Sequence, residues 1–143
     1  EEKGQIELIY STFQKTAVDM VLATGDVSIE SGKAMAFLNL VDVDGWGIEN
    51  AVVTLTDDSG ADAGVVHYLN TSGSRLDGTR NSTSGSGAVA IPNVDPGVYT
   101  LTVSVPNMDC LPWFSWNSDE ANTVQVPLQA DAVTRTGLYC VSN

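Results

Sequence analysis

Side chains able to carry out catalysis are sparse in this chain of 143 residues. The single histidine, His67, has no nucleophile or second metal ligand near it in the sequence, and neither a His-Glu-x-x-His nor a Gly-x-Ser-x-Gly motif occurs. The 18 acidic residues contain no pair whose spacing marks it for acid–base work. We therefore expect a protein that is not an enzyme and carries no cofactor.

One turn has the composition of a calcium-binding loop. Asp42 and Asp44 are followed by Gly45, and hard cations bind to several oxygens on short, glycine-bent segments. An EF-hand would need an acidic residue two positions before Asp42, where Leu40 stands. The alternative is a tight hairpin in which Asp and Gly serve the turn geometry. Asp42 and Asp44 are calcium candidates on the first interpretation only.

A cysteine and three aromatic residues lie close together in CLPWFSWN, residues 110–117, which we expect to form a loop. Exposed tryptophan faces stack on sugar rings, so Trp113, Phe114 and Trp116 are candidates for a carbohydrate platform. Large aromatic side chains are also common at protein interfaces and at the ends of hydrophobic cores. All three interpretations stay open for these residues.

Two cysteines and two sequons favour an exported protein. A disulfide between Cys110 and Cys140 would close a loop of about 30 residues and stabilise the fold by roughly 3–4 kcal/mol, whereas two buried free thiols are the alternative. Asn70 and Asn81 begin Asn-x-Ser/Thr tripeptides and are candidate glycosylation sites. The first residue is Glu1, and we expect an extracellular or cell-surface protein whose export signal has been removed.

The composition argues against two classes of partner. Eighteen acidic and six basic residues give a net charge of −12, which opposes binding to nucleic acid and to anionic membrane surfaces. No apolar run approaches the ~20 residues that a membrane-spanning helix needs. Hydrophobic residues form 43% of the chain, which is enough for a folded domain with a core.

The elements that must position these residues follow a period of two. In residues 98–105, VYTLTVSV, large apolar side chains alternate with Thr and Ser, which indicates a half-buried strand. A break is expected at residues 92–97, with a turn at Pro96 and a positive φ at Gly97. The other strands expected after residue 33 lie at residues 34–43, 51–56, 65–69, 88–91, 123–128 and 132–141. Short strands with frequent turns are typical of an all-β sandwich.

The first 33 residues carry a separate pattern, and we expect them to be rich in strands. Ile6, Leu8 and Tyr10 share one face of a predicted strand at residues 5–13, whereas residues 16–23 fit either a strand or a short helix. An alternating strand can add to a sheet edge of a neighbouring subunit, as in pilus-type fibres, so these three residues are donor-strand candidates. The alternative is that the extension packs on its own domain.

Two central segments resemble a known family. FLNLVDVDGWGIENAVVTLTDDSG and GSGAVAIPNVDPGVYTLTVSVPN are similar to the two halves of the carboxypeptidase regulatory-like domain, which is related to transthyretin-like and Cna-B-type sandwiches. The resemblance spans residues 36–105, and Val89 stands where that family commonly has Phe. It implies a seven-stranded, Greek-key-type β-sandwich without catalytic residues of its own.

The sequence therefore predicts an N-terminal strand extension at residues 1–33 and a β-sandwich at residues 34–143. The leading hypothesis is a secreted structural or adhesive surface subunit, a glycoprotein that self-associates into a pilus-like filament through its N-terminal strand. The alternative is an accessory module that binds a polysaccharide through Trp113 and Trp116.

Overall fold

Segments of alternating apolar and polar residues form the strands, and turns rich in Gly, Asp and Asn separate them. The computed structural model describes residues 5–8, 12–116, 118 and 120–143. The strands are β1 (Gln5–Leu8), β2 (Ala34–Val41), β3 (Val52–Thr56), β4 (His67–Tyr68), β5 (Ala88–Val94), β6 (Gly97–Ser104), β7 (Met108–Phe114), β8 (Thr123–Leu128) and β9 (Ala132–Ser142), and the helix is α1 (Thr12–Ala23).

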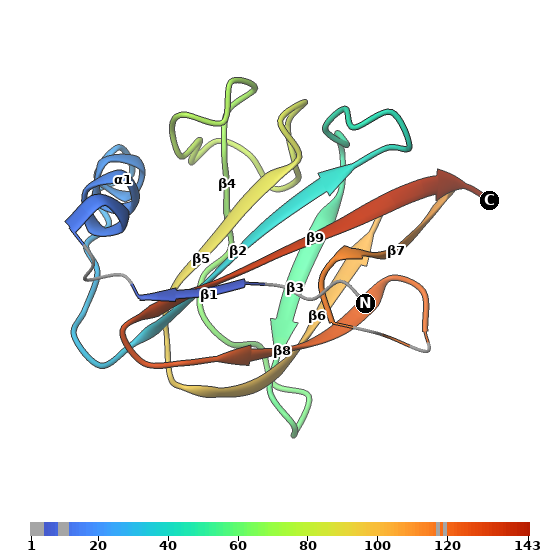
Figure 1. Ribbon diagram of the computed structural model, residues 1–143. Helices are drawn as coiled ribbons and strands as arrows, with labels where there is room; N and C mark the ends of the chain where they lie inside the picture. The colour runs from blue at the N-terminus through green and yellow to red at the C-terminus, as the bar shows by residue number, and fades with distance from the viewer. Residues whose placement is uncertain (1–4, 9–11, 117, 119) are drawn as a thin grey trace.

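Two sheets pack face to face, which confirms the predicted all-β sandwich (Figure 1). The larger sheet has the order β1-β9-β2-β5-β4, with β7 also paired to β9, and the smaller sheet has the order β3-β6-β8. Strands β2 and β9 run parallel, whereas the other neighbours are antiparallel.

The described part of residues 34–143 contains eight strands, one more than the predicted seven. The additional strand is β7, which contains Pro112 and which the sequence analysis expected to be a loop. That prediction was wrong because β7 pairs with β9 alone and forms an edge of the sheet, where a proline without an N–H group is tolerated.

The main core lies between the two sheets. Ala36, Leu38 and Leu40 alternate along β2 and are almost fully buried against the smaller sheet. Leu101 and Val103 of β6 meet them from the opposite side and are equally buried. The period of two in the sequence thus sorts the side chains between the core and the outer faces.

The predicted break at residues 92–97 is a β-bulge followed by a short corner. Ala34 pairs with Val94 but Ala36 pairs with Ile91, so β5 carries one extra residue. Asn93 has a φ of 57°. The positive φ predicted for Gly97 is wrong: Gly97 begins β6, and the left-handed residue of this stretch is Asn93 in the bulge of β5, a residue type that tolerates that conformation.

The N-terminal extension contains a strand and a helix in its described part, rather than strands alone. Val18, Val21 and Leu22 recur at helical spacing, and all three pack on the outer face of the larger sheet. The helical period prevails because that face offers apolar partners, Met35, Ala90 and Val133 among them. No helix in the described residues is long and apolar enough to span a membrane.

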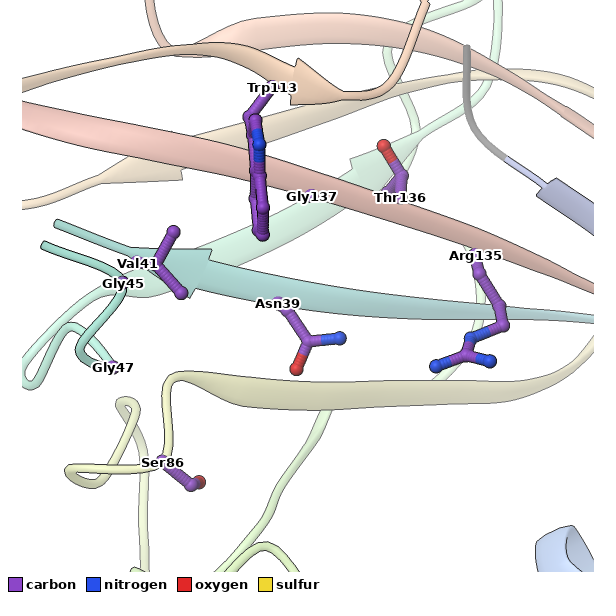
Figure 2. Close-up of a pocket in the computed structure, with 9 residues that line it drawn as sticks. All are labelled: Asn39, Val41, Gly45, Gly47, Ser86, Trp113, Arg135, Thr136 and Gly137. Atoms are coloured by element: carbon purple, nitrogen blue, oxygen red, sulfur yellow. The ribbon is translucent and has the colours of Figure 1, made fainter. Parts of the chain in front are cut away.

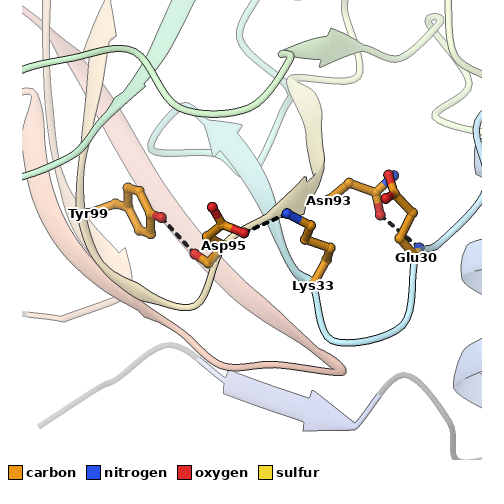
Figure 3. A network of polar contacts seen from close by, with 5 residues as sticks. All are labelled: Glu30, Lys33, Asn93, Asp95 and Tyr99. Atoms are coloured by element: carbon orange, nitrogen blue, oxygen red, sulfur yellow. Dashed lines mark hydrogen bonds and ion pairs between the residues drawn. The ribbon is translucent and has the colours of Figure 1, made fainter.

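Polar contacts fasten the segment between α1 and β2 to the corner between β5 and β6 (Figure 3). The Asn93 amide oxygen accepts the backbone N–H of Glu30 at 2.9 Å. The Lys33 ammonium donates to the Asp95 carboxylate at 2.5 Å, and this hydrogen bond raises the pKa of Lys33. The Tyr99 hydroxyl donates to the Asp95 carbonyl oxygen at 2.6 Å. Residues 30–33 are therefore held against their own sandwich.

Candidate functional site

The outer face of the larger sheet is covered by α1 over one half only. Met35 and Phe37 of β2 belong to the cluster beneath the helix. Asn39 and Val41 continue the same face of β2, because alternate residues share a face, but they lie outside that cluster. Within the described part of the chain, the helix does not cover this second half of the face.

Two adjoining hollows lie on the uncovered half, with volumes of about 420 and 300 Å³. We call them together the groove. The larger hollow is lined by Asn39, Val41, Gly45, Gly47, Ser86, Trp113, Arg135, Thr136 and Gly137 (Figure 2). The smaller hollow is lined by Val41, Asp42, Val43, Gly45, Trp113 and Tyr139. Val41, Gly45 and Trp113 line both hollows, so these three residues mark their junction.

Trp113 owes its position to a bulge in β7. Pro112 pairs with Leu138 and Phe114 pairs with Gly137, so Trp113 is the extra residue between them. Its ring reaches from β7 across β9 towards Val41 (Figure 2). Gly137, which has no side chain, lies beneath this path, and 51% of the Trp113 surface stays exposed. The bulge thus places the Trp113 ring above a part of the sheet where Gly137 has no side chain.

Close backbone packing closes one end of the groove. A Cβ on Gly47 would overlap the carbonyl oxygen of Gly85, and one on Gly87 would overlap that of Leu40. Gly87 also has a φ of 63°, which favours glycine. These glycines let the loop after β2 lie against the turn before β5, and Ser86 of that turn lines the larger hollow.

Asn39 is one of the polar residues that line the larger hollow, together with Ser86, Arg135 and Thr136. Its amide makes no hydrogen bond with the described part of the protein. The sequence analysis did not single it out, although a polar residue within AMAFLNLV was a usable signal. An aromatic wall beside a planar amide that can both donate and accept suits binding rather than catalysis.

The predicted aromatic platform does not lie on a single surface. Trp113 faces the groove, whereas Trp116 packs against the core between the sheets. The side chain of Phe114 lies outside the described part of the chain. Trp46, on the loop after β2, is 74% exposed but lines neither hollow. Only Trp113 of the predicted pair is thus available to stack on a sugar in the groove.

The geometry of the calcium candidates supports the turn interpretation. One carboxylate oxygen of Asp42 accepts the backbone N–H groups of Asp44 at 2.8 Å and of Trp46 at 3.0 Å. Asp57 binds Ser59 and Ala61 in the same way, at 2.9 and 3.0 Å. Among the described residues, no three His, Cys, Asp or Glu side chains gather as a metal site would require. Hydrogen bonds from the loop's own backbone N–H groups to Asp42 therefore account for its shape.

The predicted disulfide is confirmed, because Cys110 of β7 and Cys140 of β9 are paired directly across the two strands and bonded. Of the two sequon asparagines, Asn81 is exposed, whereas the Asn70 amide oxygen accepts backbone N–H groups within its own turn. Partial burial lowers the pKa of His67, which belongs to no metal-binding cluster of described residues.

The edge of β9 that faces away from β2 is shared by two strands. β7 pairs with it from Ser142 to Gly137, and β1 pairs with it from Arg135 to Ala132. Two of the donor-strand candidates lie in β1, where Ile6 pairs with Thr134 and Leu8 pairs with Ala132 of the same chain.

The third candidate, Tyr10, lies outside the described residues.

At the junction between β1 and β7, the Thr136 hydroxyl donates to the Ser115 hydroxyl. We call the stretch Ala132–Arg135 the open edge, because no strand of residues 34–143 covers it.

Neither a protein-family model nor a curated protein matches this chain. The resemblance of residues 36–105 to the carboxypeptidase regulatory-like domain rests on the two quoted segments. Any functional inference therefore starts from the groove and from the open edge of β9.

Proposed function

We propose that this protein is a non-catalytic structural or adhesive subunit of an extracellular surface, and that copies of it join by strand addition. One observation carries this proposal. The sandwich formed by residues 34–143 leaves the open edge of β9 without a partner of its own, and a strand from the separate N-terminal extension fills it.

Strand addition suits this edge because its backbone N–H and C=O groups need partners. β1 supplies them over four register pairs, from Gln5 opposite Arg135 to Leu8 opposite Ala132. The same hydrogen bonds form whether β1 comes from its own chain or from a second copy. A strand passed from each copy to the next gives a head-to-tail contact, and such contacts produce filaments when the rotation does not close.

Three further features fit a surface subunit. The disulfide between Cys110 and Cys140 suits an oxidising compartment outside the cell. Asn81 is exposed, as a glycan carrier must be. The net charge of −12 keeps separate molecules soluble, so a specific contact such as a strand has to drive assembly. Export after removal of a signal is part of this proposal.

The test compares the full chain with a variant that lacks residues 1–8. We expect the full chain to form concentration-dependent oligomers or filaments in analytical ultracentrifugation and electron microscopy, and the shortened chain to stay monomeric. A synthetic peptide of residues 1–11 should bind the shortened chain. The matched control peptide carries Ile6→Pro and Glu7→Pro together. Successive N–H groups of a strand point to opposite sides, so one of the two prolines removes an N–H group that faces β9, and this peptide should not bind.

Circular dichroism shows whether the shortened chain keeps its strands. If it does not, Ile6→Pro and Glu7→Pro together in the full chain serve as the second variant and should reduce assembly in the same way. A full chain that stays monomeric at all concentrations, or oligomers that survive both changes, would overturn the proposal.

A further inference from the structure

We propose that the groove binds a neutral glycan chain, with Trp113 as the stacking platform and Asn39 as the hydrogen-bonding group. This role goes beyond assembly and does not depend on it, because the groove lies on the face of the sheet whereas β1 occupies its edge.

The position of Trp113 is the first argument for a glycan ligand. An indole ring at the junction of two hollows, half exposed, presents apolar surface that the fold itself does not cover. A pyranose ring has an apolar C–H face of matching shape, and successive sugars of a chain offer such faces repeatedly. Because Gly137 adds no side chain beneath the ring, a sugar can lie flat on the sheet beside it.

The position of Asn39 is the second argument for a glycan ligand. Asn39 stands in register beside Gly137 of β9 and Ala88 of β5, two of the smallest residues, so its amide is reachable between them. The amide has no hydrogen-bond partner in the described part of the protein. A planar amide that donates and accepts at once fits two neighbouring hydroxyl groups of a sugar. Ser86 adds a hydroxyl group at the closed end.

The geometry disfavours other ligands. A peptide bound by strand addition needs an exposed edge, but β2 is paired on both sides, with β5 and with β9. An acidic polysaccharide is opposed by the net charge of −12, and the two charged residues of the lining, Arg135 in the larger hollow and Asp42 in the smaller one, give the groove no excess of positive charge. Volumes of about 420 and 300 Å³ lie within the usual range for small-ligand sites, about 300–1,000 Å³.

The experiment titrates the full chain with neutral hexasaccharides, namely cellohexaose, mannohexaose and chitohexaose, and with hexagalacturonate as the anionic comparator. Tryptophan fluorescence gives the affinity. Two-dimensional NMR of the Asn39 side-chain amide and the Trp113 indole N–H gives the location. We expect at least one neutral chain to bind and to shift both signals.

Variants distinguish the groove from any other aromatic surface. Trp113→Ala should weaken binding roughly tenfold or more, and Asn39→Leu, which keeps the size but removes the hydrogen bonds, should weaken it severalfold. Trp46→Ala is the matched control, since this tryptophan is exposed on a neighbouring loop but lines neither hollow. It should leave the affinity unchanged.

Three outcomes would overturn the proposal. One is no binding of any neutral hexasaccharide at millimolar concentration. Another is tighter binding of hexagalacturonate than of every neutral chain. The third is binding that survives Trp113→Ala but not Trp46→Ala. None of these results affects the assembly test, because the described residues of the deleted segment, 5–8, do not line the groove.

Discussion

The two halves of one sheet face are built differently. Where α1 lies on the larger sheet, the outward residues are apolar, and Met35, Ala90 and Val133 pack beneath Leu22. Where no helix lies on it, the same face carries Asn39 and Gly137 and leaves Trp113 half exposed. The strands and their alternation are common to both halves. The difference shows that the types of the outward residues follow what covers the sheet, because apolar residues lie under the helix and polar or small residues lie where the face is not covered by it.

Removing the disulfide tests the uncovered half of the sheet. We expect this change to lower the free energy of unfolding more than the other variants do. The disulfide joins β7, which carries Trp113, to β9, which carries Gly137. Cys110→Ala combined with Cys140→Ala should lower the free energy of unfolding by about 3–4 kcal/mol, because the unfolded chain regains the freedom of a loop of about 30 residues. Urea unfolding measures the change, and the reduced natural chain is the control. A loss below about 1 kcal/mol would show that this half does not depend on its covalent link.

Leu22→Ala tests the covered half. Leu22 is fully buried between α1 and the sheet, so the truncation should lower the free energy of unfolding by about 3 kcal/mol. Met20→Ala is the matched control on the same helix, because Met20 is 68% exposed, and it should change stability by no more than about 0.5 kcal/mol. Equal effects of the two variants would contradict the packing of α1 on the sheet.

Acid should weaken the covered half slightly. Leu76 packs in the cluster under α1 and its N–H group donates to the Thr24 hydroxyl, which follows the helix. The adjacent Asp77 accepts hydrogen bonds from the Thr79 hydroxyl and N–H groups, and these lower its pKa below the usual 3.8. The unfolded chain therefore takes up this proton first as the pH falls. The stabilisation is complete above the unfolded pKa and is lost as the pH falls through the folded one.

Asp77→Asn isolates this contribution. The melting temperature of the natural chain should drop more between pH 6 and pH 3 than that of the variant. The effect is the smallest of the three, since the carboxylate lies at an exposed surface. Identical acid profiles for the two proteins would show that the hydrogen bonds to Asp77 do not stabilise the fold.

Much of the sandwich could be predicted from the sequence because its signals are local. The alternation in residues 98–105 marks β6, and the two cysteines were correctly paired. Residues 16–23 were ambiguous, because a short apolar segment fits both periods until the sheet beneath it is known. β7 was missed because its strand conformation depends on pairing with the distant β9, and Pro112 is accommodated there because β7 is an edge strand.

The groove could not be predicted from the sequence because it depends on register between distant strands. Asn39 lies beside Gly137 only through the parallel pairing of β2 with β9, which brings together residues almost a hundred positions apart. The separation of Trp113 from Trp116 has a similar cause. A bulge at Trp113 breaks the alternation of side chains between the two faces of β7, and no sequence pattern indicated this bulge.

The recurrent aspartate loop has a practical consequence. The loops at residues 42–46 and 57–61 share the same aspartate contacts and a left-handed glycine at the fourth position, yet the fifth residue is Trp46 in one and Ala61 in the other. The turn therefore uses the N–H group of the fifth residue but not its side chain. The side chains at these two positions can therefore be varied while the sandwich is kept. The chain can serve as a scaffold that presents chosen side chains on two loops.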